Sequence, residues 1–367
     1  MLRPVTEEAP VRSEPPAVTV SGEDSERARA AVAAALLRAR RVVLTSHERT
    51  DADGAGSALG LALALRAAGR DARVAFPSPL PGNLAFLPGA AEAAVVPAGA
   101  PIPDDLRDAD CVVSLDSGSA SRLGGLRPLG EAARAFLDVD HHASNDGFGT
   151  HRWVDPSYAA TGIMALELAC ELGVPLSREA CLCFYTAIVF DTGGFAFSNT
   201  DPRTHRAAAA CIERGVRPEQ VTRHLHRSRS LASWRFHAEA VGRVRTTPDG
   251  AVAWITVPRE SLDRHALPET EVPELVEVPV SLAPTRIAFV LTELPDGGGV
   301  RASLRSRCPI PVHHLAARHG GGGHARAAGM TLPGTLAEAE GLLLDEAKRE
   351  LALWASRHRG DLPPQDA

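Results

Sequence analysis

Short apolar runs alternate with longer helical patterns in the first 140 residues of the chain. The runs lack a period of two, which is typical of parallel strands buried on both faces. They cover residues 41–45, 72–76, 111–115 and 135–139. Helical patterns fill residues 24–40 and 54–68. This alternation predicts an α/β domain built on a parallel sheet.

The pattern becomes helical from Thr161 to about residue 240. Residues 177–190 are too long for a typical strand and too apolar for a surface helix, so they predict a core helix that ends near Asp191. Strands then return, and a long helix closes the pattern. These elements are predicted at 252–257, 286–293, 300–305 and 336–354, with a hairpin turn at 295–299.

Two α/β domains are therefore expected, because 367 residues exceed what one compact core usually holds. The second domain is the smaller one. The expected parts are a flexible leader at 1–22, a first domain at 23–225, a helical linker at 226–245, a second domain at 246–355 and a flexible tail at 356–367.

Charge and composition narrow the classes of partner. The formal net charge is -6, so a broad basic surface that follows a long nucleic acid is not expected, whereas a small phosphate ligand remains compatible. Lys348 is the only lysine, and the abundance of arginine makes an isolated arginine weak evidence for phosphate binding. No run approaches about 20 apolar residues, and the first ten residues do not resemble a signal peptide. We expect a cytoplasmic protein with no membrane partner.

Acidic and histidine side chains follow several of the predicted strands. The loop after the first strand carries His47, Asp51 and Asp53, and Asp116 ends a later strand. Further candidates are Asp140, His141, His142 and Asp191. The first loop alone is equally well explained by helix capping. Because parallel strands deliver their carboxyl ends to one edge, the full set instead predicts two divalent cations, Mn²⁺ first and Mg²⁺ second.

A glycine-rich segment stands near the end of the chain. Residues 319–329 read HGGGGHARAAG, in which Gly321, Gly322 and Gly323 let backbone N–H groups approach an anion. A helix is expected to begin at His324 and to add its positive N-terminal end. A simple linker is the alternative interpretation. The predicted strand just upstream contains Ser303 and Arg305.

These motifs, in this order, resemble those of the DHH-DHHA1 phosphoesterases, a family that includes RecJ-like and NrnA-type proteins. The resemblance covers roughly residues 30–350 and implies a DHH catalytic domain at 23–225 followed by a DHHA1 substrate-binding domain at 246–355, with the active site in the cleft between them. The commonest first motif of the family has Pro-Asp-Gly-Asp-Ala where this chain has Thr-Asp-Ala-Asp-Gly at 50–54. The ligand types are kept, so this departure concerns the shape of the loop.

The resemblance also implies roles for the residues. It gives one metal to His47, Asp51 and Asp116, and the other to Asp53, Asp116, His141 and Asp191. Asp140 would support the site from behind, and His142 would face the substrate phosphate. His142 and His324 would stabilise charge or protonate the leaving oxygen. Substrate binding would fall to Ser303, Arg305, Gly321, Gly322, Gly323 and His324.

The implied activity is metal-dependent hydrolysis of short oligoribonucleotides, linear or cyclic dinucleotides, or 3'-phosphoadenosine 5'-phosphate. A catalytically silent nucleotide sensor and a RecJ-like single-strand exonuclease are the alternatives. The sequence is compatible with a homodimer and does not fix the oligomeric state. Trp153 and Phe197 could stack on a base, but core packing is the favoured interpretation of both.

Overall fold

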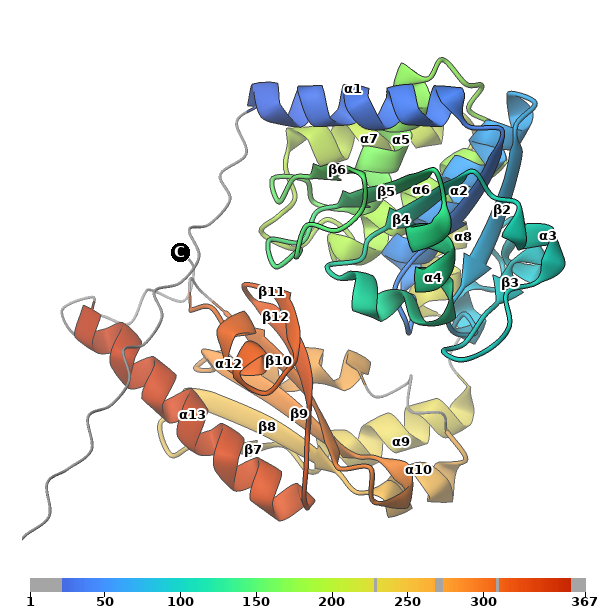
Figure 1. The fold of residues 1–367 in the computed structure, drawn as a ribbon. Coiled ribbons are helices and arrows are strands. Elements are labelled where there is room, and N and C mark those ends of the chain that lie inside the picture. The colour runs from blue at the N-terminus through green and yellow to red at the C-terminus, as the bar shows by residue number, and fades with distance from the viewer. Residues whose placement is uncertain (1–21, 228–229, 268–272, 308–309, 358–367) are drawn as a thin grey trace, which may run out of the picture.

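The computed structural model describes residues 22–227, 230–267, 273–307 and 310–357. The expected leader and tail fall almost wholly outside these ranges. Two six-stranded sheets are present, each with helices on both faces (Figure 1). Among the described residues, no helix combines the length and the apolar character needed to cross a bilayer.

All neighbouring strands of the first sheet are parallel, in the order β3-β2-β1-β4-β5-β6. These strands are β1 (Arg41–Thr45), β2 (Asp71–Phe76), β3 (Ala94–Val95), β4 (Cys111–Leu115), β5 (Ala135–Asp140) and β6 (His151–Val154). Leu44 and Leu137 face one core while Val43 and Phe136 face the other, so successive residues of a strand are buried on opposite sides. This two-sided burial explains why the strands lack an alternating polar pattern.

Among the described residues, six helices contribute to the hydrophobic core on one face of the first sheet. They are α1 (Gly22–Arg38), α2 (Ala52–Ala67), α5 (Thr161–Glu171), α6 (Arg178–Asp191), α7 (Pro202–Glu213) and α8 (Pro218–His226). The other face is covered by α3 (Asp104–Arg107), the 3-10 segment η3 (Ala120–Leu126) and α4 (Arg127–Ala132). The prediction of a core helix ending near Asp191 is confirmed by α6.

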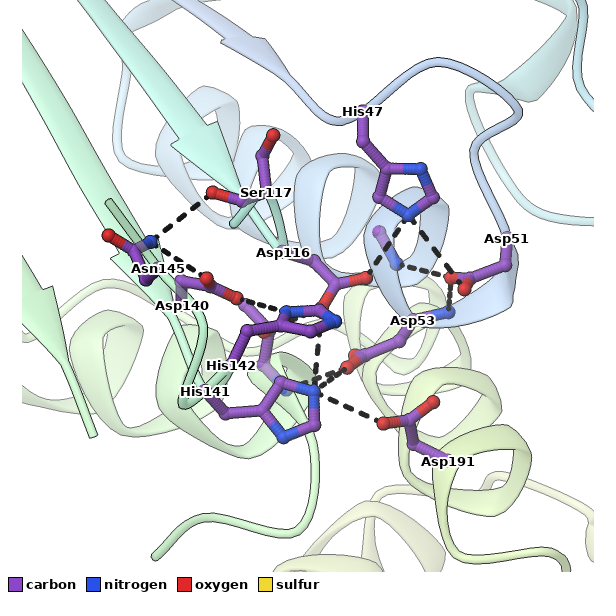
Figure 2. Close-up of polar contacts among 12 residues, drawn as sticks. His47, Asp51, Asp53, Asp116, Ser117, Asp140, His141, His142, Asn145 and Asp191 are labelled. Atoms are coloured by element: carbon purple, nitrogen blue, oxygen red, sulfur yellow. Dashed lines mark hydrogen bonds and ion pairs between the residues drawn. The ribbon is translucent and has the colours of Figure 1, made fainter. Parts of the chain in front are cut away.

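Close packing of α2 on α6 fixes the relative positions of the two helices. A Cβ atom on Gly56 would lie 2.4 Å from the carbonyl oxygen of Cys183, and one on Gly60 would lie 2.5 Å from the ring of Phe184. Only glycine allows this approach. Asp53 near the start of α2 and Asp191 at the end of α6 are thereby held in the same region (Figure 2).

The second sheet is mixed, in the order β11-β12-β10-β9-β8-β7. Its strands are β7 (Arg245–Thr246), β8 (Val252–Val257), β9 (Ile287–Glu293), β10 (Val300–Ser306), β11 (Gly322–His324) and β12 (Ala327–Leu332). The pair β8-β9 is parallel and the other pairs are antiparallel. One face packs against α12 (His313–Arg318) and α13 (Leu336–Arg357). The other packs against α9 (Leu231–Val241), α10 (Arg259–His265) and the segment that leads into α11 (Glu277–Val280).

The prediction of a helix that begins at His324 is wrong. The glycine-rich segment instead forms β11, which turns back into β12 as an antiparallel pair. A Cβ atom on Gly321 would lie 2.2 Å from the carbonyl oxygen of Gly329, so the glycines serve close strand pairing. The positive helix end expected beside an anion is therefore absent from this described segment. The domain boundary placed between 225 and 245 stays a prediction.

Candidate metal centre

The candidate metal centre lies where the first sheet reverses its strand order. The chain moves outward from β1 through β2 and β3 on one side, and from β4 through β5 and β6 on the other. Open α/β sheets place ligands at the carboxyl ends of strands beside such a reversal. His47 follows β1, Asp116 follows β4 and His141 follows β5, and Figure 2 shows these side chains converging.

One group of potential ligands joins His47 and Asp51 to Asp116. The Nε2 atom of His47 lies 3.5 Å from Asp116 Oδ2 and 3.8 Å from Asp51 Oδ2. Asp51 also caps α2, because its carboxylate accepts hydrogen bonds from the backbone N–H groups of Asp53 and Gly54. Helix capping and a place in the cluster are therefore compatible at this residue.

A second group gathers Asp53, His141 and Asp191 around the other oxygen of Asp116. The Nε2 atom of His141 lies 3.1 Å from Asp191 Oδ2, 3.5 Å from Asp116 Oδ1 and 3.6 Å from Asp53 Oδ2. Adjacent ligands of an octahedral cation with bonds of about 2.1 Å lie about 3 Å apart, which is close to this spacing. Asp116 thus directs one carboxylate oxygen toward each group (Figure 2).

Backbone carbonyls face the Nδ1 atoms of two histidines at the site. His47 Nδ1 lies 2.8 Å from the carbonyl oxygen of Glu48, and His141 Nδ1 lies 3.0 Å from that of Tyr158. A carbonyl only accepts, so in His141 Nδ1 carries the proton and Nε2 is the atom left to bind a cation, whereas His47 Nδ1 also faces a guanidinium, which only donates. In both residues Nε2 is the atom that faces the carboxylates. The guanidinium of Arg122 also lies 3.0 Å from His47 Nδ1.

The N-terminus of α5 donates hydrogen bonds to Asp53 and Asp116. Backbone N–H groups of Thr161 and Gly162 donate to the two oxygens of Asp53 at 2.7 and 2.8 Å. The hydroxyl of Thr161 donates to Asp116 Oδ1 at 3.1 Å. Asp116 itself has a φ of 63°, in the left-handed region that non-glycine residues rarely adopt. The strand end is thus strained at the residue shared by both groups.

The electrostatics of the cluster favour a cation. Burial, followed by the nearby charge of Asp116, raises the pKa of Asp51 and raises that of Asp53 well above the ordinary value. Burial acts to raise the pKa of Asp116, but hydrogen bonds with His141 and His47 outweigh it and hold that pKa well below its usual range. For His141, burial lowers the pKa and the surrounding carboxylates raise it by more. Buried carboxylates in this proportion to imidazoles fit divalent cations such as Mn²⁺ or Mg²⁺.

His142 points into the same region but is held differently. Its Nδ1 atom lies 2.6 Å from Asp140 Oδ1 and 3.6 Å from Asp116 Oδ1. Asp140 is fully buried, and it in turn accepts a hydrogen bond from the Asn145 amide at 2.8 Å. His142, His141 and Asp116 also form a third set whose ligating atoms lie within 4.8 Å of one another.

Comparison with known proteins assigns the chain to a family. Residues 41–188 match the model of the DHH family N-terminal domain, and residues 263–353 match that of the DHHA1 domain. The chain is 32% identical over 312 residues to the bifunctional oligoribonuclease and PAP phosphatase NrnA of Thermus thermophilus, covering 84% of this chain and 90% of that protein. The chain belongs to the DHH family.

Two further relatives extend the comparison. The protein of the same name from Bacillus subtilis is 26% identical over 296 residues, covering 79% of this chain and 89% of that protein. The crystal structure of an exopolyphosphatase-related protein from Bacteroides fragilis superposes with a TM-score of 0.81 at 23% identity, covering 89% of this chain and 97% of that one. The similarity to the Bacteroides fragilis protein, at 23% identity, concerns the fold alone.

The residues expected to bind substrate in this DHH-family protein lie on the second sheet. Ser303 and Arg305 share the partly exposed face of β10, because successive residues of that strand alternate between buried and partly exposed. Arg305 Nε donates to Glu277 of α11 at 3.1 Å. Gly321, Gly322 and Gly323 lie in and beside β11. The backbone of His324 ends that strand, but its side chain is outside the part that the structure describes.

One hydrogen bond links the second sheet to the segment that follows Asp191. Arg326, in the turn between β11 and β12, donates to the hydroxyl of Ser198 at 3.2 Å. Ser198 belongs to the segment that follows Asp191. In the same segment Phe197 is 45% exposed, so the interpretation as a core residue is wrong for it. Trp153 is fully buried and donates to Ser25 Oγ, which confirms core packing there.

Several residues at the site were not found from the sequence. Tyr158 acts through its carbonyl oxygen and Thr161 partly through its N–H group, so neither side-chain type signals the role. Asp138 could have been noticed, because it lies two residues before Asp140 on the same strand. Asn145 follows His142 by three residues, and only its contacts in the structure reveal its position.

Proposed function

We propose that this DHH-family protein hydrolyses phosphoester bonds in short nucleotides with the help of two divalent cations, Mn²⁺ or Mg²⁺. The substrates in view are short oligoribonucleotides, linear or cyclic dinucleotides, and 3'-phosphoadenosine 5'-phosphate. Its relatives from Thermus thermophilus and Bacillus subtilis are named oligoribonuclease and PAP phosphatase, and the chain covers about nine-tenths of each. The protein is proposed to work in the cytoplasm. The homodimer stays a prediction that light scattering can test.

The position of Asp116 carries this proposal. Its Oδ2 lies beside His47 Nε2 and its Oδ1 lies beside His141 Nε2, at 3.5 Å in both cases. One carboxylate can therefore bridge two cations, with His47 and Asp51 completing one set and Asp53, His141 and Asp191 completing the other. When bound, two such cations would make a water molecule at the site more acidic and would shield the negative charge of the phosphoryl oxygens.

The protein groups have separate tasks in this proposal. His142 lies beside the cluster, and its Nδ1–H donates a hydrogen bond to Asp140 Oδ1 at 2.6 Å, which leaves Nε2 to contact the substrate or the leaving oxygen. Arg305 and Ser303 offer a guanidinium and a hydroxyl from one face of β10 to a terminal phosphate. The glycines of β11 and the residue His324 are proposed to bind the same phosphate group.

A screen of small phosphate compounds tests the proposal. Purified protein with Mn²⁺ is given the dinucleotide pApA, cyclic di-AMP, RNA of two to five nucleotides, 3'-phosphoadenosine 5'-phosphate and pyrophosphate. We expect turnover of one or more nucleotides and none with the matched variant Asp116→Asn. Turnover of pyrophosphate alone would contradict the proposed substrate class. Binding of nucleotides without any turnover would favour the silent sensor.

A further inference from the structure

The side chain of Asn145 connects two buried carboxylates behind the metal centre. Its Nδ2 atom lies 2.8 Å from Asp140 Oδ2 and 2.9 Å from Asp138 Oδ2, with the carbonyl oxygen of Ser117 further away at 3.3 Å. Both carboxylates are fully buried. Figure 2 shows Asn145 beside Asp140, on the side away from the ligands His47 and Asp51.

The orientation of the Asn145 amide follows from its partners. Its Oδ1 accepts a hydrogen bond from the backbone N–H of Gly147 at 2.7 Å. Carboxylates and carbonyls accept, so the atom that faces Asp138, Asp140 and Ser117 must be the NH₂ group. Its two hydrogens match the two shortest contacts. Asp140 therefore accepts from Asn145 at Oδ2 and from His142 at Oδ1.

From this arrangement we infer that Asn145 is a positioning residue for the reaction, because its amide fixes the Asp140 carboxylate that orients His142. The inference rests on the proposed function, in which His142 contacts the substrate. With its outer oxygen held by Asn145, the carboxylate of Asp140 cannot rotate away from His142 without losing a hydrogen bond inside the protein core. The second hydrogen bond of the amide, to Asp138, holds the Asn145 side chain in place.

The loop around Asn145 is itself tied down, which suits this role. The backbone N–H of Asn145 donates to the carbonyl oxygen of His142 at 3.2 Å, and that of Asp146 donates to Gly118 at 3.0 Å. The guanidinium of Arg152 donates to the carbonyl oxygen of Gly147. The amide therefore starts from a fixed backbone, so the hydrogen bonds it makes are already aligned before substrate arrives.

Kinetics of paired variants test the inference. Asn145→Ala removes the amide, and Ser144→Ala changes an exposed neighbour on the same loop as the matched control. With pApA and Mn²⁺, we expect Asn145→Ala to lower kcat about 10- to 100-fold, the range for removing a group that orients a ligand or catalytic side chain. KM should change less than about threefold, and metal analysis should still find the wild-type content. Asn145→Asp, which keeps the shape but loses the donor, should be at least as slow.

A double-mutant cycle separates positioning from simple structural support. If Asn145 acts through His142, then adding Asn145→Ala to His142→Ala should lower kcat by less than about twofold. An equal loss in both backgrounds, or loss of bound metal in Asn145→Ala, would overturn the inference.

A spectroscopic measurement decides the matter independently of turnover. The Nδ1 proton of His142, hydrogen-bonded at 2.6 Å, should give a downfield proton resonance that disappears in His142→Ala. That resonance should shift in Asn145→Ala and stay in place in Ser144→Ala. An unshifted resonance in Asn145→Ala would overturn the inference even if wild-type protein hydrolyses none of the nucleotides, whereas that lack of turnover alone would refute only the proposed function.

Discussion

Replacing Asp138 by asparagine should stabilise the protein relative to wild type by an amount that increases as the pH rises. Asp138 is fully buried, and its Oδ1 has no hydrogen-bond partner among the described residues. Burial, and next the charge of Asp140, raise the pKa of Asp138 well above the ordinary value. The folded protein thus retains a proton that the unfolded chain releases above a pH of about 4. Wild-type stability should therefore fall with rising pH until the folded pKa is passed.

The size of the effect follows from one retained proton. Between the unfolded and folded pKa values, wild type loses up to about 1.4 kcal/mol of unfolding free energy per pH unit from this group. The asparagine side chain of the Asp138→Asn variant would resemble the protonated acid, because its amide oxygen can still accept from Asn145. The variant has no proton to retain, so its stability lacks this slope.

Urea denaturation of the two proteins at several pH values between about 4.5 and 8 measures the difference, since this range starts just above the ordinary pKa of an aspartate. EDTA is present throughout, so that proton uptake is not mixed with metal binding. We expect the variant to gain on wild type as the pH rises, and the gap to level off above the folded pKa. A gap that stays constant would refute the reasoning. A gap that moves in favour of wild type would mean that Asp138 is charged in the folded protein.

Three further outcomes are expected. Gly162→Ala should destabilise the protein by about 1–3 kcal/mol in urea denaturation, because the added Cβ would lie 2.4 Å from Ala187 Cβ, whereas Gly341→Ala on α13 meets nothing within 4 Å and should not. Arg305→Ala should raise KM for pApA about 10- to 100-fold while both metals stay bound, so loss of a metal would contradict its place in substrate binding. Specific activity should fall as RNA lengthens from two to about ten nucleotides with a shallow salt dependence, and the opposite trends would favour a RecJ-like exonuclease.

The acidic and histidine cluster could be predicted because each ligand type stands at a recognisable place. Strands buried on both faces read as short apolar runs, and β1 and β4 have the predicted bounds. Parallel strands send their carboxyl ends to one edge, so Asp116 and His141 had to approach His47. The same reasoning could not choose which oxygen of Asp116 faces which group. That depends on the backbone angle of Asp116 and on the hydroxyl of Thr161.

The parts that could not be predicted depend on pairing between distant backbone groups. The residues Ala325–Arg326–Ala327–Ala328 have high helix propensity, yet β12 pairs with β10 along its whole length. Tertiary pairing outweighed local preference in this segment. Asn145 was missed for a similar reason, because an asparagine in a polar loop usually signals a turn. Only the buried carboxylates of Asp138 and Asp140 give its amide another role.

The proposed bridging of two cations by Asp116 is tested most directly by anomalous diffraction from crystals grown with Mn²⁺. We expect two manganese peaks about 3.5–4 Å apart, one beside His47 and Asp51 and the other beside His141 and Asp191, with one oxygen of Asp116 on each. Crystals of Asp116→Asn should lose at least one peak, and the variant should lose turnover while its fold is retained. A single ion in the wild-type protein, or two ions that Asp116 does not touch, would contradict the two-cation site.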